Sequence, residues 1–323
     1  MASLYRSLLV PTRIMLKASH IVMQLILYGA GCIAALFYSM WAFRMKLTKG
    51  PSRVFQKIKR LPPKILTDSC YGEHNYLTLK KSGTRLHYVT AGEEGACLML
   101  FFACISPEFS WRHQLKVFSQ EFKVVALDMK GCDLSDAPLA WECYQRDIIL
   151  EDIQDVIKAL GSEDPKCILV GHNWGAAIAC EFAANHPNMV EKLIFMMVFQ
   201  HMFSSVRLIF FCVFGLTIRD SLFRVQWSLK LYVSGVGIWL DYFTRKDILV
   251  PTLLLWGKKD AYMEDGLVNQ ILPYLQGSYH IHFFPDVSHW LPEEQPEKVN
   301  QVIRDFLQGK KNDCLGQQAL VQG

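Results

Sequence analysis

Residues Lys166–Cys180 constrain the fold more than any other part of the chain, because they form the pattern of a buried strand that turns sharply into a helix. Apolar residues lead to Gly171, a second glycine follows at position 175, and small residues continue at helical spacing. Glycines there allow close backbone approach, and such a turn holds its central side chain at the carboxyl end of a sheet. The central residue is Asn173, where a turn of this kind normally carries a serine, cysteine or aspartate nucleophile.

The rest of the chain alternates strands with helices. Short apolar strands separated by helices predict an α/β fold, with a mostly parallel eight-stranded sheet covered by helices on both faces. The predicted strands are Asn75–Leu79, Arg85–Thr90, Cys97–Phe102, Lys123–Asp128, Cys167–Val170, Lys192–Val198, Thr252–Trp256 and His280–Phe284. The predicted helices include Arg146–Leu160, Trp174–His186, Glu264–Tyr274 and Pro296–Leu307. The first two strands form a hairpin around residues 81–83.

Residues 199–249 interrupt this alternation. They are rich in Phe, Leu, Val and Trp, and they predict a shortened helical lid over the carboxyl edge of the sheet, with shallow membrane contact as a second role. The main domain is therefore predicted at residues 74–308 with this insertion, followed by a polar tail at 309–323 that we expect to be disordered.

A long apolar segment near the amino terminus predicts a membrane anchor. Residues 21–43 carry no charge, and about 20 helical residues cross a hydrocarbon core roughly 30 Å thick. A buried helix and a signal peptide are the alternatives, but the run is long for either. Residues 1–20 carry three basic residues and residues 44–64 carry eight with no acid. This bias predicts a short luminal amino terminus, a basic linker at 44–73 and a cytosolic catalytic domain, with the endoplasmic reticulum as the membrane.

The composition limits which metals, cofactors and binding partners the sequence predicts. The ten cysteines are scattered without the spacing of a disulfide framework, which favours reduced thiols in a cytosolic core. No zinc-ligand pattern, Walker loop or Rossmann fingerprint occurs, so the sequence predicts no metal and no cofactor. The net charge of +4 gives no support for nucleic-acid binding. A lipid-like small molecule and the membrane are the expected partners.

Three polar residues come directly after predicted strands, and they occur in the order nucleophile, acid, histidine. Asn173, Asp260 and His289 would meet at the carboxyl edge of a parallel sheet, where ligands of such sheets bind. The order is that of an α/β-hydrolase. Asp260 would then orient His289, and His289 would activate water as a general base.

The chain resembles the epoxide hydrolase branch of the α/β-hydrolases, specifically its membrane-anchored members. The motifs that carry the resemblance are Tyr71-Gly-Glu-His74, Leu86-His-Tyr-Val89, Ser110-Trp-Arg-His-Gln114, Val124-Val-Ala-Leu-Asp128, Gly171-His-Asn-Trp-Gly175, Pro251-Thr-Leu-Leu-Leu-Trp-Gly257 and Ser288-His-Trp290. The resemblance implies hydrolysis of lipophilic, fatty-acid-type epoxides to diols through an ester at residue 173. It further implies an oxyanion hole made by the N–H groups of Ser106 and Trp174. Tyr232 and Tyr242 are the lid candidates for protonating the epoxide oxygen.

Three features depart from the family pattern. Asn173 replaces the aspartate nucleophile, residues 103–108 replace the family's His-Gly-Phe-Pro-Glu loop, and the lid is about half the length that the resemblance implies. One interpretation is an active enzyme in which activated water converts Asn173 to aspartate. A second is a catalytically impaired, membrane-anchored binding or scaffold protein, and a third is an imperfect transcript.

Overall fold

The computed structural model describes residues 69–103, 108–161, 166–197, 247–260 and 266–309, together with helical positions between 36 and 48. The chain divides into two units, Met1–Pro62 and Pro63–Gly323. Most of the predicted anchor at 21–43 lies outside the described residues. So do the predicted luminal segment 1–20, most of the linker, most of the lid and almost all of the tail.

In the first unit, the described residues are helical and expose large apolar side chains, including Leu36, Phe37 and Trp41. Within the described part of the chain, no helix combines the length and the hydropathy needed to cross a membrane.

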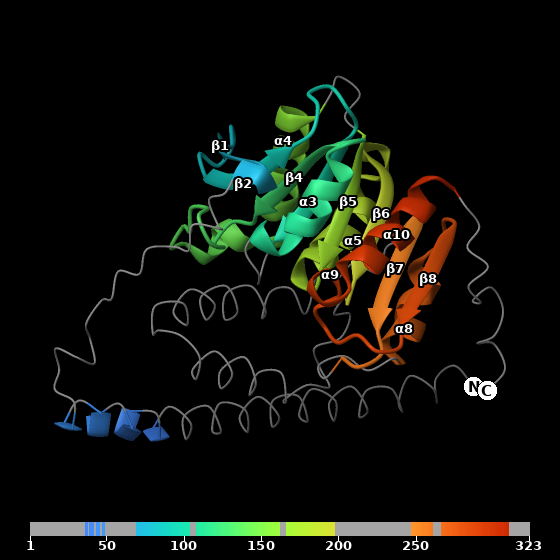
Figure 1. Ribbon diagram of the computed structural model, residues 1–323. Helices are drawn as coiled ribbons and strands as arrows, with labels where there is room; N and C mark the ends of the chain where they lie inside the picture. Colours follow the sequence, from blue (N-terminus) through green and yellow to red (C-terminus); the bar gives the residue numbers. More distant parts are fainter. Residues whose placement is uncertain are drawn as a thin grey trace, which may run out of the picture. The chain divides into compact units, whose positions relative to one another are not determined.

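The second unit is built on one eight-stranded sheet with the order β1-β2-β4-β3-β5-β6-β7-β8 (Figure 1). β1 and β2 form the predicted antiparallel hairpin, β2 also runs antiparallel to β4, and all the other neighbours are parallel. The strands are β1 Glu73–Thr78, β2 Arg85–Ala91, β3 Leu98–Ala103, β4 Lys123–Asp128, β5 Cys167–His172, β6 Val190–Met196, β7 Thr252–Gly257 and β8 Tyr279–Phe284. The predicted mostly parallel sheet is therefore confirmed.

The described helices of this unit lie between the strands in the sequence or after the last one. They are α3 Arg112–Phe118, α4 Arg146–Leu160, α5 Trp174–Asn185, α8 Gly266–Ile271, α9 Leu291–Glu294 and α10 Pro296–Leu307, with a short 3₁₀ helix, η3, at Glu108–Trp111. The predicted bounds of β4, α4 and α10 are confirmed. Most of the other predicted elements differ from the structure by one or two residues at an end, and the differences at β6 and α8 have a clear cause. The strand predicted at Lys192–Val198 ends at Met196, because Met197 takes a positive φ of 51°. The helix predicted at Glu264–Tyr274 is described only as α8 followed by a 3₁₀ turn at Leu272–Tyr274, which contains Pro273.

The strand order places helices on both faces of the sheet. From β3 the chain crosses to β4 in one direction, and from β4 it returns past β3 to β5 and β6 in the other. Since parallel crossovers are right-handed, α3 lies on one face, and α4 and α5 lie on the opposite face. α9 and α10 pack on α3, while α4 packs on α5.

The reversal of strand order also determines where a ligand site forms. The helices that follow β3 and β5 lie on opposite faces, and in an open α/β sheet ligands bind outside the carboxyl ends of the strands where this reversal occurs. Residues 103–108 and 172–174 follow these two strands. The central strands β3, β4, β5 and β7 that support this edge are almost wholly buried and apolar.

Candidate active site

The turn between β5 and α5 holds Asn173 in a backbone conformation that side chains rarely adopt. Its φ is 56° and its ψ is −117°. A Cβ at Gly171 would come within 2.5 Å of the Gly175 carbonyl oxygen, and a Cβ at Gly175 within 2.7 Å of the Phe102 carbonyl oxygen, so both positions require glycine. The Asn173 N–H donates to the Met196 carbonyl at 3.0 Å, which fixes the turn to β6. The close approach predicted for the two glycines is thus confirmed.

Asn173, His289 and Asp260 form a hydrogen-bonded chain. Asn173 Nδ2 lies 2.5 Å from His289 Nε2, and His289 Nδ1 lies 2.6 Å from Asp260 Oδ2. The carboxylate accepts the Nδ1 proton, so the Nε2 lone pair accepts from the Asn173 amide. Asn173 is 7 % exposed and His289 3 %. The three residues predicted to meet are therefore in contact, with the histidine in the tautomer that a general base needs.

Within the hydrogen-bonded chain of Asn173, His289 and Asp260, the Asn173 amide oxygen is a buried acceptor that lacks a hydrogen-bond donor among the described residues. Trp174 is the first residue of α5, and the first N–H groups of a helix have no intrahelical partner. Its role as an oxyanion donor stays a prediction. Ser106, Tyr232 and Tyr242 lie outside the described residues.

The loop that carries His289 is held close to the sheet. A Cβ at Gly257, the last residue of β7, would come within 2.4 Å of the Ser288 carbonyl oxygen, so glycine is required where this loop passes. The Ser288 N–H donates to Glu294 at 2.9 Å, and the Ser288 hydroxyl donates to the same carboxylate. Next to Glu294, Glu293 accepts two hydrogen bonds from Arg112, at 2.6 and 2.5 Å. The short helix α9 therefore fixes the loop to the start of α3.

His172, the last residue of β5, contacts the backbone of His289. Its Nε2 lies 2.8 Å from the His289 carbonyl oxygen, so Nε2 carries the proton and donates it. Burial, followed by the charge of nearby His289, lowers the pKa of His172 to about 3. His172 is therefore neutral at physiological pH and orients the His289 backbone without adding a charge to the site.

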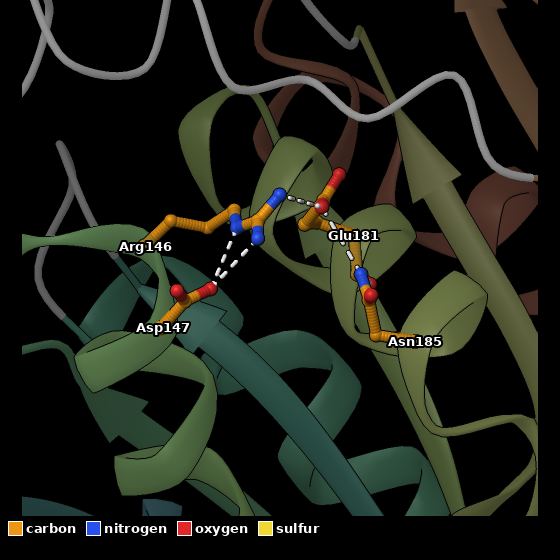
Figure 2. Close-up of polar contacts among 4 residues, drawn as sticks. All are labelled: Arg146, Asp147, Glu181 and Asn185. Carbon is orange, nitrogen blue, oxygen red and sulfur yellow. Dashed lines mark hydrogen bonds and ion pairs between the residues drawn. The ribbon is translucent and has the colours of Figure 1, made fainter.

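A largely buried ion pair anchors α5 behind the elbow (Figure 2). Arg146, the first residue of α4, donates to Glu181 on α5 at 3.2 Å, and Asn185 donates to the same Glu181 oxygen at 3.0 Å. Arg146 also donates to exposed Asp147 at 2.8 Å. The Glu181 side chain is 2 % exposed and that of Arg146 17 %. This contact joins α4 to the helix whose first turn follows Asn173.

Comparison with known proteins decides the family. Residues 106–210 match the family model described as alpha/beta hydrolase fold. The chain is 35 % identical to epoxide hydrolase 3 of Xenopus tropicalis, over 97 % of this chain and 98 % of that protein. This chain belongs to the epoxide hydrolase family. It is also 32 % identical to human epoxide hydrolase 4, over 91 % of this chain and 95 % of that protein. Among solved structures, an epoxide hydrolase of Bacillus megaterium in complex with an inhibitor shares 26 % identity, with a TM-score of 0.60 over 72 % of this chain and all of that one.

The sequence motifs contained the supporting residues Arg112 and His172 but gave no indication of what they contact. Nothing in the sequence pattern marked Glu293 and Glu294 as supporting residues. They lie four and five residues after the predicted histidine, so an inspection of its sequence neighbours for carboxylates could have found them.

Proposed function

We propose that this protein hydrolyses lipophilic epoxides to diols, and that it first makes its own nucleophile by converting Asn173 to aspartate. The observation that carries the proposal is the 2.5 Å contact between Asn173 Nδ2 and His289 Nε2, with His289 oriented by buried Asp260. In this proposal His289 is the base, Asp260 holds it in the required tautomer, and the conversion gives residue 173 the carboxylate that a nucleophile needs.

The conversion is a hydrolysis of the side-chain amide. A water molecule displaces the amide N–H from the His289 Nε2 lone pair, gives a proton to Nε2, and forms a bond from its oxygen to the Asn173 Cγ. The Cγ–Nδ2 bond then breaks, and the nitrogen leaves as ammonia with the proton from His289. Nδ2 lies 2.5 Å from Nε2 before the water enters, so the nitrogen has only a short distance to return to the protonated His289 once the water oxygen is bonded to Cγ.

The resulting aspartate would act as in the rest of the family. Its carboxylate attacks an epoxide carbon, the carbon–oxygen bond opens, and the oxygen takes a proton from a lid tyrosine, for which Tyr232 and Tyr242 are the candidates. Water activated by His289 then attacks the ester carbonyl at residue 173 and releases the diol. The N–H groups of Ser106 and Trp174 are the proposed donors to the oxygen that becomes negative in this step.

We further propose a fatty-acid-type epoxide as substrate and a cytosolic domain held at the endoplasmic reticulum. The uncharged run 21–43, the basic linker that follows it and the apolar composition of residues 199–249 support this proposal.

The experiment is to follow residue 173 and epoxide turnover in the same sample. We expect the peptide Cys167–Lys192 from freshly purified protein to shift with time from the amide mass to the acid mass. Diol production from a long-chain fatty-acid epoxide should rise in parallel. Asp260→Asn and His289→Gln should keep the amide mass. An acid mass that appears equally fast in both variants would refute a conversion driven by His289.

A catalytically impaired binding or scaffold protein is the second candidate. The observation in its favour is the same contact, in which the amide N–H occupies the lone pair that water would use. An amide mass that persists after long incubation, with no diol formed, would establish this candidate for the protein as synthesised. Turnover by an Asn173→Asp variant would then show that the amide alone prevents the chemistry.

A further inference from the structure

Two histidines and a buried glutamate converge at the hairpin side of the sheet. His74 lies on β1, His87 on β2 and Glu108 at the start of η3, and their ligand atoms all lie within 4.8 Å of one another. His74 Nδ1 and His87 Nε2 are 3.0 Å apart. None of these residues takes part in the contacts of Asn173, Asp260 and His289 described above.

His87 is oriented as metal-binding histidines are. It is fully buried, and its Nδ1 lies 2.8 Å from Asp128 Oδ2, so Nδ1 carries the proton and the Nε2 lone pair faces His74. The other Asp128 oxygen accepts the backbone N–H of Glu108 at 3.1 Å. A carboxylate that holds the far nitrogen of a histidine fixes its tautomer and its ring, and this is the usual outer shell of a metal-ligating imidazole.

Glu108 supplies a buried carboxylate oxygen. The residue is 4 % exposed, and its Oε2 is buried without a hydrogen bond from any described residue. The carboxylates of Glu108, Asp128 and Asp133 lie within 4.8 Å of one another. A cation at this point would offset both the burial of the carboxylate and its repulsion by its neighbours.

We propose that His74 Nδ1, His87 Nε2 and a Glu108 carboxylate oxygen bind a divalent metal ion, with zinc as the ion that this donor set fits best. Two imidazoles and one carboxylate are a common zinc ligand set, which leaves a fourth position for water. Zinc–nitrogen bonds of about 2.0–2.1 Å in a tetrahedral site place two nitrogens about 3.3 Å apart, close to the separation found here. Sequence reasoning predicted no metal, because the three ligands lie on separate elements and do not form a known ligand spacing.

Binding requires one adjustment. Without metal the two rings share a hydrogen bond, with ring centroids 5.1 Å apart, so the nitrogens face each other nearly head-on. His74 is exposed on an edge strand, and it can turn as its Nδ1 releases the shared proton and the ion enters from solvent. Zinc affinity should therefore fall as the pH is lowered. The bound ion would link β1 and β2 to Glu108, the residue directly after segment 104–107.

The test is equilibrium zinc binding to the metal-stripped full-length protein, measured by competition with a chromophoric chelator. We expect a site that His74→Gln and Glu108→Gln abolish. Asp128→Asn should weaken it about 10- to 100-fold, because the outer-shell partner of His87 is lost. His280→Gln is the matched control, since it removes an exposed histidine from β8 at the other edge of the sheet.

Cobalt(II) binding distinguishes this site from metal binding by cysteines. Cobalt(II) at the proposed ligands should give visible bands of a tetrahedral nitrogen–oxygen site without a thiolate charge-transfer band. Zinc binding that is unchanged in His74→Gln would overturn the proposal, and so would an absence of binding to the parent protein. Because His74 is exposed, its replacement is compatible with folding, and the result does not depend on whether the protein hydrolyses epoxides.

Discussion

Removing the guanidinium from the pair between α4 and α5 tests how much the anchoring of the elbow helix contributes to stability. In Arg146→Met the Glu181 carboxylate, 2 % exposed, loses its arginine partner and keeps the Asn185 amide at 3.0 Å. Removing one member of a buried ion pair typically costs about 3–5 kcal/mol. Since Arg146 is itself 17 % exposed and Asn185 still donates, we expect the low end, about 3 kcal/mol.

The measurement is unfolding in urea, followed by tryptophan fluorescence, with thermal unfolding as a second probe. A loss of about 3 kcal/mol corresponds to a Tm about 6–12 °C lower for a domain of this size. Asp147→Asn is the matched control, because it removes the other carboxylate that contacts Arg146. The Asp147 side chain is 78 % exposed, so its replacement should cost less than about 1 kcal/mol. Equal losses in the two variants would refute the argument that burial determines the cost.

The remaining predictions concern the elbow, a glycine of α8 and His172. Asn173→Asp should form diol from the first turnover, without the lag expected of the parent protein, and a progress curve measures the difference. Gly171→Ala should destabilise the fold by at least about 3 kcal/mol in urea unfolding, because its Cβ would come within 2.6 Å of backbone atoms of α5. Gly266→Ala in α8, where a Cβ meets nothing within 4 Å, should instead stabilise it by about 0.5–1 kcal/mol. Burial lowers the pKa of His172 from 6.5 to about 3. Between pH 6.5 and about 3, His172 is therefore protonated in the unfolded chain and neutral in the folded protein. Stability should fall by about 1 kcal/mol per pH unit in that range, and a smaller pH dependence in His172→Gln would confirm the assignment.

Much of the fold could be predicted because strands such as β4 and helices such as α4 have clear local signals. β4 is a short apolar run with defined ends, and α4 has apolar residues at helical spacing. The end of β6 had no such signal, since the apolar run continues past Met196. Its end depends on the positive φ of Met197 and on the hydrogen bond from Asn173 to Met196.

The site could be predicted where each residue directly follows a strand, as Asn173, Asp260 and His289 do. The groups that support them could not, because they depend on contacts between distant segments. Arg112 and Glu293 are 181 positions apart in the sequence, and nothing local to either residue indicates the other. The cluster of His74, His87 and Glu108 was missed because the hairpin prediction gave no register for its two strands and no link to Glu108.

The order of the strands also has a consequence for synthesis on the ribosome. β7 and β8 occupy one edge of the sheet and come last in the chain, so the first six strands can pair before either emerges. Asn173 precedes His289 by 116 residues. A nascent chain therefore builds the elbow early and receives His289 only after β8 has emerged. A chain truncated before β8 would retain a nearly complete sheet and lack the histidine on which the proposed hydrolysis at residue 173 depends.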